Sequence, residues 1–285
     1  MSDHTSEQSA DVVARLRATF RTGRTRPVEW RTGQLRRLRA MLTERGADLA
    51  AALKADLGKS STEAYRTEID FTVREIDHTL EHLDGWLHPE PAPVPAHLGA
   101  DATAWTQYDP LGVVLVIAPW NYPAQLLLAP VVGALASGNA VVAKPSELAP
   151  ATSAALAELS RPISTPTRSP SSRAASGDHG PAGRAVHHVF YTGNGTVGRI
   201  VMRAAAEHLT PVTLELGGKS PVFVDRNTDL DVVADRLPAA SSSTPGRPAW
   251  PPTTSSPTGD RSRPGGRPGP RRRRPGTAPT RRPRR

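Results

Sequence analysis

The chain has 285 residues, which is enough for one large domain or two modest ones. Hydrophobic residues make up 37%, against about 45–50% in ordinary globular chains by a count that includes Gly, while Pro (29) and Gly (23) are frequent. The lack of any cysteine excludes disulfides, thiolate metal sites and a cysteine nucleophile in the chain as written. No apolar run is long enough to span a membrane and the N-terminus has no signal pattern, so we expect a cytoplasmic protein.

The formal net charge of +9 comes from the C-terminal end of the chain alone. Residues 241–285 contain twelve Arg and one acid, Asp260, which gives +11. The first 240 residues therefore hold 24 basic and 26 acidic groups, a balance of −2. Residues 160–186 form a second unusual stretch, with four Arg among many Ser, Pro and Gly. Neither stretch has apolar periodicity, so we expect neither to fold independently.

From about Ser6 to Leu87 the apolar residues recur at helical spacing. Within this region Ser60-Ser-Thr-Glu63 has the pattern of a capping box that opens a helix. The helical pattern breaks between Pro89 and Pro95. We therefore predict an N-terminal helical region over residues 1–97.

Strands and helices alternate in the next part of the chain. Residues 103–108 alternate like an edge strand, and the apolar run Leu111–Ala118 predicts a strand buried on both faces of a parallel sheet. Further strands are predicted over 140–143, 189–192, 212–214 and 222–224, and helices over 124–136, 151–159, 197–208 and 230–237. This alternation predicts an α/β fold, with a doubly wound, Rossmann-like parallel sheet over residues 98–240.

A glycine-rich motif lies between a predicted strand and a predicted helix: Gly193-Asn194-Gly195-Thr196-Val197-Gly198. In a G-x-G-x-x-G turn of this kind, small residues let the backbone approach a pyrophosphate at a helix N-terminus, whose free amides favour anions. A simple tight turn is an equal alternative for so short a motif. A dinucleotide-binding motif of this kind is usually followed about 20 residues later by an acid that holds the ribose. Glu215 is near that spacing, but it belongs to a motif of another kind, so we assign no ribose-binding acid from this pattern.

Three further motifs follow predicted strands: Pro119-Trp120-Asn121-Tyr122-Pro123, Lys144-Pro145-Ser146-Glu147 and Glu215-Leu216-Gly217-Gly218-Lys219. All three stand at carboxyl ends of strands, where α/β sheets place their ligands. In this order the set resembles the aldehyde dehydrogenase family. The segment 20–27, Phe-Arg-Thr-Gly-Arg-Thr-Arg-Pro, and Tyr191-Thr-Gly-Asn194 resemble its class-three branch. The resemblance covers residues 10–159 and 187–240.

The resemblance implies a truncated aldehyde dehydrogenase fold, with NAD or NADP as the cofactor for oxidising aldehydes to carboxylic acids. Asn121 resembles the family's oxyanion donor, with a turn Asn as the alternative. Glu215 resembles the general base that directs water onto a thioester, with a solvated strand-end carboxylate as the alternative. Lys144 and Glu147 resemble the pair that holds the cofactor's ribose, with a surface ion pair as the alternative. Pro119 and Trp120 belong to the same cofactor site by resemblance, although Trp120 can equally be core packing.

The family nucleophile is a cysteine downstream of the E-L-G-G-K motif, and this chain has none. Residues 241–258, back-translated with GC-rich codons and read one base earlier, can encode Lys-Phe-Leu-Asn-Ala-Gly-Gln-Thr-Cys-Val-Ala-Pro-Asp-Tyr-Val-Leu-Thr-Asp, which resembles the family's cysteine loop. Residues 163–176, shifted likewise, can encode a plausible strand, which we expect to belong in the centre of the sheet. We interpret 160–186 and 241–285 as out of frame through single-base deletions, and expect this chain to have lost the activity.

Three functions stay open. The first is an aldehyde dehydrogenase lineage, and the second is a non-catalytic remnant that still binds nucleotide. The third is nucleic-acid binding through 241–285, which we rank last because this tail has no Lys and one aromatic residue, Trp250. We predict no metal site, since His187-His188 adjoin the unusual stretch and we find no other His or acid at metal-ligand spacing. For the intact family member the resemblance implies a small aldehyde substrate and a homodimer.

Overall fold

The computed structural model describes residues 2–99, 101–160, 186–219, 221–225, 227–242 and 253–254. The N-terminal region is helical, as predicted, with α1 (Ser2–Arg21), α2 (Val28–Glu44), α3 (Gly46–Leu57), α4 (Ser61–Ala64), a π-helical turn η1 (Tyr65–Ile69) and α5 (Asp70–Trp86). The predicted cap at Ser60 is confirmed, because its hydroxyl accepts a hydrogen bond from the Glu63 amide at 3.1 Å. None of the described helices is long and apolar enough to cross a membrane.

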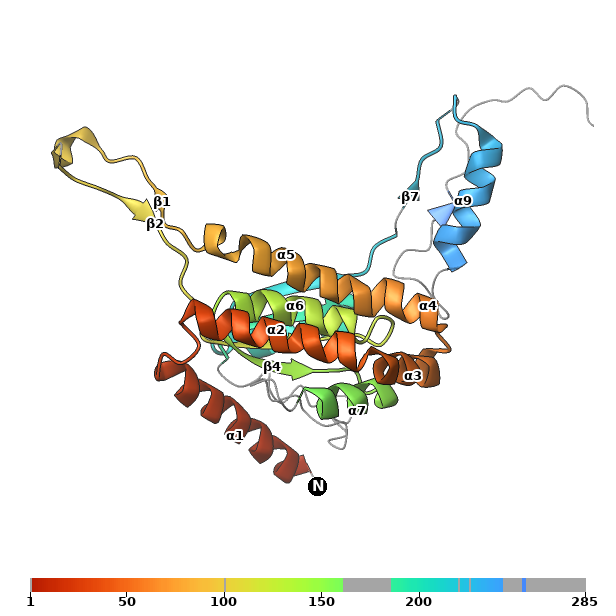
Figure 1. Cartoon of the computed structure of the whole chain (residues 1–285), viewed down its shortest axis with the longest axis horizontal. Coiled ribbons are helices and arrows are strands. Elements are labelled where there is room, and N and C mark those ends of the chain that lie inside the picture. The colour runs from red at the N-terminus through yellow and green to blue at the C-terminus, as the bar shows by residue number, and fades with distance from the viewer. Residues whose placement is uncertain are drawn as a thin grey trace, which may run out of the picture.

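The Pro-rich break after α5 contains a strand that the sequence did not predict. β1 (Glu90–Pro91) pairs antiparallel with β2 (Trp105–Thr106), and the 3-10 turn η2 (Ala96–Leu98) lies between them. Pro91 is tolerated here because the hairpin has only two strands, and Pro is confined to such edge positions. The edge strand predicted over 103–108 is therefore shorter than expected and belongs to a hairpin that projects from the body (Figure 1).

A four-stranded parallel sheet forms the centre of the molecule, in the order β4-β3-β5-β6. Its strands are β3 (Val113–Ile117), β4 (Ala140–Lys144), β5 (His188–Gly193) and β6 (Val212–Leu216). Helix α6 (Gln125–Ala136) joins β3 to β4, α7 (Pro150–Leu159) follows β4, and α8 (Gly195–Ala206) joins β5 to β6. All of β3 is buried, as expected for a strand with neighbours on both sides and helices on both faces. The predicted doubly wound fold is confirmed.

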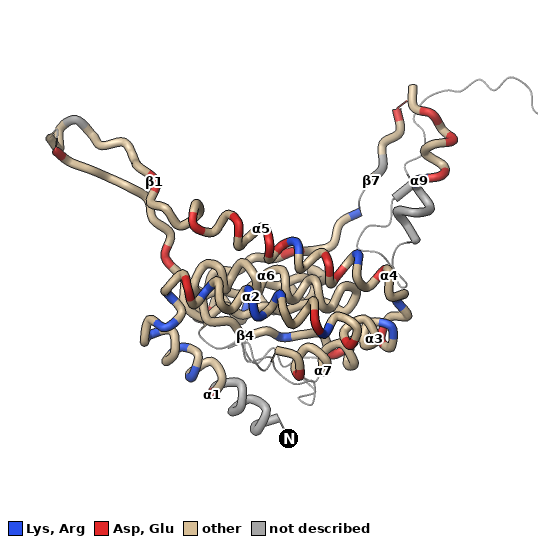
Figure 2. Tube along the Cα trace, in the orientation of Figure 1, with Lys and Arg blue, Asp and Glu red and all other residues tan. Residues whose placement is uncertain are grey.

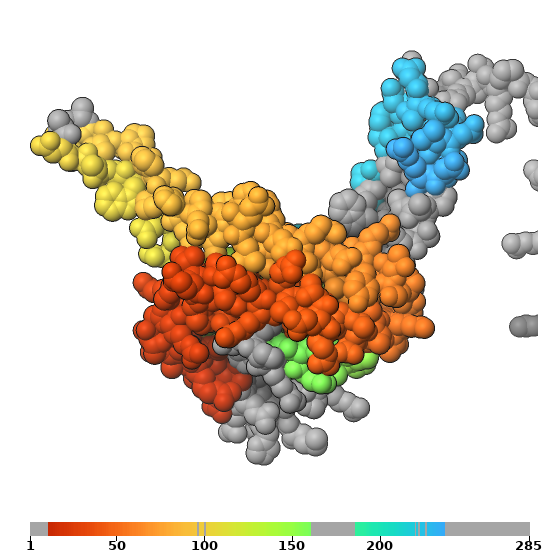
Figure 3. All heavy atoms as spheres, viewed as in Figure 1, coloured from red at the N-terminus to blue at the C-terminus, as the bar shows by residue number. Residues whose placement is uncertain are grey.

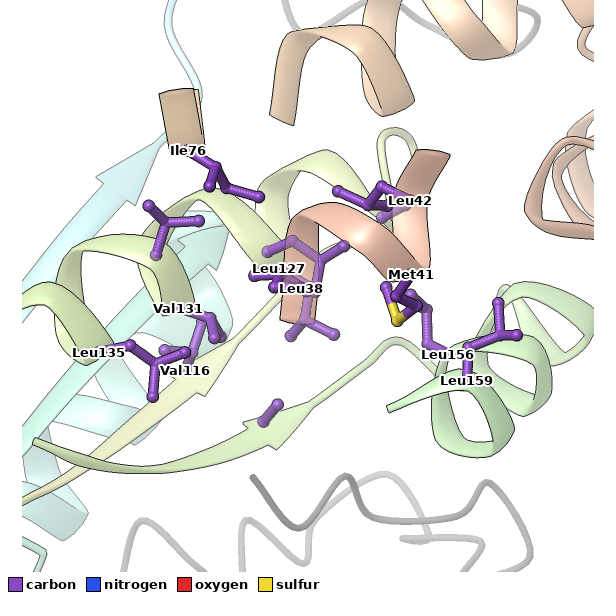
Figure 4. Packing of buried hydrophobic residues seen from close by; sticks show 14 of the residues in the cluster. Leu38, Met41, Leu42, Ile76, Val116, Leu127, Val131, Leu135, Leu156 and Leu159 are labelled. Atoms are coloured by element: carbon purple, nitrogen blue, oxygen red, sulfur yellow. The ribbon is translucent and has the colours of Figure 1, made fainter. Parts of the chain in front are cut away.

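The two faces of this sheet pack into separate cores. On one face, here called the α6 face, Val114 and Val116 of β3 pack with side chains of α2, α5 and α6, and Figure 4 shows Leu38 and Leu127 in this cluster. On the opposite face, the α8 face, the alternate residues of β3 pack with Val13 of α1 and with residues of α8. Strand residues alternate between faces with a period of two, so each strand contributes to both cores.

The sheet corrects one expectation about residues 163–176. Strand β3 is paired with β4 on one side and with β5 on the other, so the ladder from β4 to β6 is unbroken. The expectation of a strand from 163–176 in the centre of the sheet is wrong, because a further strand can join only outside β4 or β6. Residues 163–176 themselves lie outside the described part of the chain.

The chain leaves the sheet after β6. The strand predicted over 222–224 is observed as β7 (Pro221–Val222), which pairs parallel with β8 (Thr253–Thr254) and not with the main sheet. Helix α9 (Leu230–Ser242) extends further than the predicted 230–237. Figure 1 shows β7 and α9 as a second projection from the body. Apart from 241–242 and 253–254, the predicted basic tail lies outside the described residues.

Candidate functional site

The parallel sheet brings the predicted motifs to one edge. Strands β3, β4, β5 and β6 run in the same direction, so the residues that follow each strand lie at the same end of the sheet. Residues 119–123 follow β3, residues 145–147 follow β4, residues 194–198 follow β5, and residues 217–219 follow β6. The sequence prediction that these motifs share an edge is confirmed.

The glycine-rich turn joins β5 directly to the N-terminus of α8. Asn194 is the N-cap, and its Oδ1 accepts a hydrogen bond from the Val197 amide at 2.9 Å. The Tyr191 hydroxyl donates to the Asn194 carbonyl oxygen at 3.1 Å and so holds the turn from below. A Cβ on Gly193 would overlap this hydroxyl, whereas a Cβ on Gly195 would meet no atom nearer than Nη1 of Arg199 at 3.7 Å. A side chain at Gly193 would therefore force the Tyr191 ring to shift, whether or not a ligand is bound.

Gly198 fills the third glycine position of the motif for a different reason. A Cβ there would lie 3.2 Å from Cδ2 of Leu216, which is tighter than ordinary van der Waals contact. In dinucleotide-binding folds the third glycine permits this close packing of helix against strand. The turn thus has the geometry of the predicted motif, with Thr196 and Val197 in the first turn of α8.

The first-turn amides of α6 and α7 are already occupied by acids from the N-terminal helices. The amides of Ala124 and Gln125 donate to Oε2 of Glu68 at 2.8 and 3.1 Å. The amides of Ala151 and Thr152 donate to the carboxylate of Asp56 at 3.0 and 2.7 Å. Among the described residues, the N-terminus of α8 has the neutral Asn194 cap and no acid bonded to its first-turn amides. Of these three helices, α8 is the one whose positive end remains suited to a phosphate, so the residues fit a bound dinucleotide there.

Lys144 and Glu147 form the ion pair that the sequence allowed as an alternative. Their Nζ and Oε2 atoms are 3.1 Å apart, with the Lys144 side chain 16% exposed and that of Glu147 60% exposed. Burial raises the pKa of Tyr191, and the negative charge of Glu147 acts in the same direction. An ammonium group has three donors and a carboxylate several acceptor sites, so the pair keeps capacity to bind ribose hydroxyls.

Asn121 lies in the loop between β3 and α6, beside the half-buried Pro119 and Trp120. Its side-chain Oδ1 is buried and has no hydrogen-bond partner among the described residues. Its backbone oxygen accepts a hydrogen bond from Nζ of Lys59 at 3.0 Å. That ammonium is itself paired with Glu68, at 2.5 Å from Oε1. Neither Lys59 nor Glu68 was identified from the sequence, where each looks like an ordinary helix-flanking charge.

Glu215 is in β6 and pairs in register with Thr192 of β5. By the alternation along β5, these two residues share the α6 face with Phe190, whereas Tyr191 and Gly193 lie on the α8 face. Glu215 is exposed, which matches a solvated carboxylate as well as a general base. The sheet edge therefore separates the catalytic candidates, on the α6 face, from the glycine turn on the α8 face.

Metal binding has no support in the part of the chain that the structure describes, where no three His, Asp or Glu side chains gather to hold an ion. His78 and His82 do lie one turn apart on α5, with ring centroids 4.1 Å apart, a spacing that our sequence reading overlooked. Two exposed imidazoles on one helix are fewer than a closed metal site needs.

Together, the doubly wound sheet and the glycine turn at the N-terminus of α8 define a Rossmann-like α/β protein. Comparison with known proteins then places it more narrowly. The sequence model of the aldehyde dehydrogenase family matches residues 1–250, and the chain belongs to this family. The match extends across 160–186, and the interpretation of this segment as out of frame stays a prediction.

The relatives confirm the class-three resemblance. The chain is 44% identical over 238 residues to aldehyde dehydrogenase family 3 member A2 of Macaca fascicularis, covering 79% of this chain and 46% of that protein. It is 41% identical over 241 residues to the dimeric NADP-preferring aldehyde dehydrogenase of Canis lupus familiaris, covering 80% and 50%. The chain thus spans about half the length of these curated relatives.

A solved structure confirms the fold. The substrate-bound state of Staphylococcus aureus AldH matches with a TM-score of 0.78 and 32% identity, over 88% of this chain and 54% of that one. Members of the family use NAD or NADP, as the NADP-preferring relative and a matched complex with NAD+ show.

Proposed function

We propose that this chain derives from an NAD(P)-dependent aldehyde dehydrogenase of the class-three branch that oxidises aldehydes to carboxylic acids. The observation that carries the proposal is the sheet edge, where four motifs of the family meet and where α8 has the free positive end. The family match over residues 1–250 supports it. We further propose that the chain as written binds the dinucleotide but does not oxidise aldehydes.

The cofactor side of the site consists of the glycine turn, the Lys144–Glu147 pair, and Pro119 with Trp120. The amides at the start of α8 hold the pyrophosphate, and the Lys144–Glu147 pair holds a ribose. When bound, NAD(P) supplies a hydride acceptor. The open position at Gly195 and the packing of Gly198 against Leu216 support this assignment.

The catalytic side consists of Asn121 and Glu215. If a cysteine nucleophile were restored, the Asn121 amide would donate a hydrogen bond to the aldehyde oxygen as that oxygen becomes negative, which would stabilise the tetrahedral state. Glu215 would then accept a proton from the water that releases the acid from the thioester. Glu215 is exposed and so accessible to water. It lies on the α6 face, the same side of the sheet as the loop that carries Asn121.

The missing element is the nucleophile. The chain has no cysteine, and hydroxyl groups are poor nucleophiles near neutral pH without an activating base. We propose that the cysteine codon was lost when residues after 240 passed out of frame, across the positions of Pro248 and Ala249. Sequencing the locus in independent clones tests this: we expect the codons of 241–258, read one base earlier, to encode the cysteine loop, and the lack of that loop in every clone contradicts the proposal.

The substrate, partner and location of the intact relative follow from the family as proposals. They are a small-molecule aldehyde, a second copy in a homodimer, and the cytoplasm. A relative named as dimeric supports the homodimer. The choice between NAD and NADP is left to measurement.

The decisive experiment compares residues 1–285, unaltered, with a full-length class-three aldehyde dehydrogenase as the positive control. Both are titrated with NAD+ and NADP+ by calorimetry and assayed for aldehyde-dependent formation of reduced nicotinamide. We expect binding without turnover for the present chain. Turnover contradicts the proposed loss of activity, and the absence of dinucleotide binding contradicts the assignment of the glycine turn.

A further inference from the structure

A buried ion pair lies beneath the loop that carries Asn121. The side chains of Lys59 and Glu68 are both 0% exposed, and Nζ of Lys59 is 2.5 Å from Oε1 of Glu68. Lys59 stands between α3 and α4, and Glu68 lies in η1, the π-helical turn between α4 and α5. Such π-turns inside helices are frequent at functional sites, so Glu68 is a candidate for a role beyond stabilising the helix.

Besides pairing with each other, both charged groups form hydrogen bonds with the segment between β3 and the start of α6. Nζ of Lys59 donates to the backbone oxygen of Asn121 at 3.0 Å and lies 4.0 Å from the ring centroid of Tyr122. The second oxygen of Glu68 accepts from the amides of Ala124 and Gln125 at 2.8 and 3.1 Å. The pair therefore holds the segment 121–125 at its start and at its end.

Stability alone is a weak reason for this arrangement. Removing two charges from water is expensive, and replacing a buried ion pair by packed apolar side chains is often neutral or stabilising. Capping of α6 explains the hydrogen bonds of Glu68 to the helix amides. It does not explain the hydrogen bond from the Lys59 ammonium to the carbonyl oxygen of Asn121. That bond constrains the peptide plane next to the Asn121 side chain, whose Oδ1 is buried without a partner in the described chain.

We propose that Lys59 and Glu68 are positioning residues, which orient the loop so that the side-chain amide of Asn121 points its N–H groups into the site. The proposal rests on the proposed role of Asn121 as oxyanion donor. A hydrogen-bond donor stabilises charge in the transition state best when it is already oriented before the reaction. If it had to reorient during the reaction, the free energy of reorientation would offset that stabilisation. The pair acts through Asn121 and does not itself touch the reacting atoms.

The test uses the full chain and needs neither aldehyde nor cofactor, so its outcome is independent of the proposed activity. Glu68→Gln removes the negative charge yet keeps an oxygen for the α6 amides, and Lys59→Met removes the ammonium at similar length. Asp56→Asn is the matched control, because it makes the same carboxylate-to-amide change at the N-terminus of α7. The readouts are hydrogen exchange by mass spectrometry and the Asn121 side-chain amide resonance, which is assigned from its loss in Asn121→Asp.

We expect Lys59→Met and Glu68→Gln to shift the Asn121 side-chain amide resonance and to speed exchange over 120–125 by about tenfold or more. Exchange in β3 should stay slow in both variants, and Asp56→Asn should affect the start of α7 alone. An Asn121 resonance unchanged in both variants overturns the proposal. It is equally overturned if both variants lose protection in β3 and over 120–125 to the same extent, because the pair would then be a general stabiliser.

Discussion

Asn194 combines two demands in one side chain, because it caps α8 and stands where a pyrophosphate would bind. Its Oδ1 accepts the Val197 amide, and its carbonyl is held by Tyr191. A neutral cap satisfies the helix without adding negative charge to its positive end. By contrast, Glu68 and Asp56 place full charges on the neighbouring helices α6 and α7. The identity of the cap therefore decides which helix can accept an anion.

Asn194→Asp separates these two demands. Asp is an N-cap as good as Asn, so the variant should fold with unchanged or slightly higher stability. The added charge should repel the pyrophosphate and raise the dissociation constant for NAD+ by about tenfold or more. Calorimetric titration measures the affinity and urea unfolding the stability, with Asn194→Ser as the uncharged control. Equal NAD+ affinity in the Asp and Ser variants would place the pyrophosphate elsewhere.

His187 has a structural role at the opposite, amino-terminal end of the sheet. Its Nδ1 accepts a hydrogen bond from the Val113 amide at 2.9 Å, which requires the neutral ring. Burial lowers the pKa of His187 below its ordinary 6.5, and the positive charges of Arg17 and Arg21 in α1 lower it further. Gly112 leaves room for the ring, since a Cβ there would lie 2.6 Å from Nδ1. The expectation that His187 is no metal ligand stays a prediction. The hydrogen bond from Val113 gives His187 a structural role.

The sign of the pH effect follows from this lowered pKa. Between the lowered value and 6.5 the unfolded chain binds a proton that the folded chain resists, so stability rises with pH across that window. Acidification below 6.5 should therefore lower the urea midpoint until the lowered pKa is reached. His187→Asn keeps an acceptor for Val113 and does not titrate, so its midpoint should depend less on pH. Identical pH profiles for the two proteins would show that His187 does not contribute.

At the scale of elements, the N-terminal helices are joined to the sheet domain through acids at helix ends. Asp56 in α3 holds the first turn of α7, and Glu68 in η1 holds the first turn of α6. Neither α6 nor α7 has a side-chain cap of its own, since their N-cap residues are Ala124 and Ala149. The helical region therefore supplies the caps that these two sheet helices lack.

Asp56→Ala tests this joining at α7. Removing the carboxylate leaves the amides of Ala151 and Thr152 without it, and loss of a capping group lowers stability by about 0.5–2 kcal/mol. Urea unfolding followed by circular dichroism measures the change. Asp48, an exposed acid about two turns away on the same helix, supplies the control variant Asp48→Ala. A stability loss no greater for Asp56→Ala than for Asp48→Ala contradicts the capping role.

The sequence predicted the main elements better than the contacts beneath the site. Each strand of the main sheet was predicted, because apolar runs and alternation are local signals. The strand at Glu90–Pro91 was missed, since its Pro-rich surroundings resemble a break. Asp56 and Glu68 were missed because their partners lie 95 and 56 residues away, and no local pattern separates such acids from solvated ones.

At the scale of the whole molecule, one packed body carries two projections. Figure 3 shows the hairpin of β1 and β2 and the segment of β7 and α9 extending from the body. Trp105 on the hairpin and Phe223 before α9 are exposed, at 60% and 86%. A two-stranded hairpin is at best marginally stable alone in water. The stability of the described chain therefore resides in the sheet and its two cores.

Charge also divides the molecule. Lys and Arg mix with Asp and Glu along the described body (Figure 2), in line with the balance of −2 over residues 1–240. The twelve Arg after residue 240 create the +11 that the third function, nucleic-acid binding, would use. A basic tail neutralises phosphates and releases their counterions, whatever the base sequence.

We therefore expect residues 1–285 to bind duplex DNA of any sequence at low salt and residues 1–242 not to bind it. If the Arg cluster makes the contacts, replacing Arg271 to Arg274 with Gln should reduce the slope of log affinity against log salt by about 3.6, at about 0.9 per phosphate contact. Fluorescence anisotropy with two unrelated duplexes over a salt series measures both effects. Binding that distinguishes the duplexes, or that persists in residues 1–242, would make nucleic-acid recognition a property of the folded body. If the binding shows no preference between the duplexes and its salt dependence falls when the Arg residues are replaced, the affinity for DNA is due to the charge of the tail. The dinucleotide site then remains the functional feature of this fold.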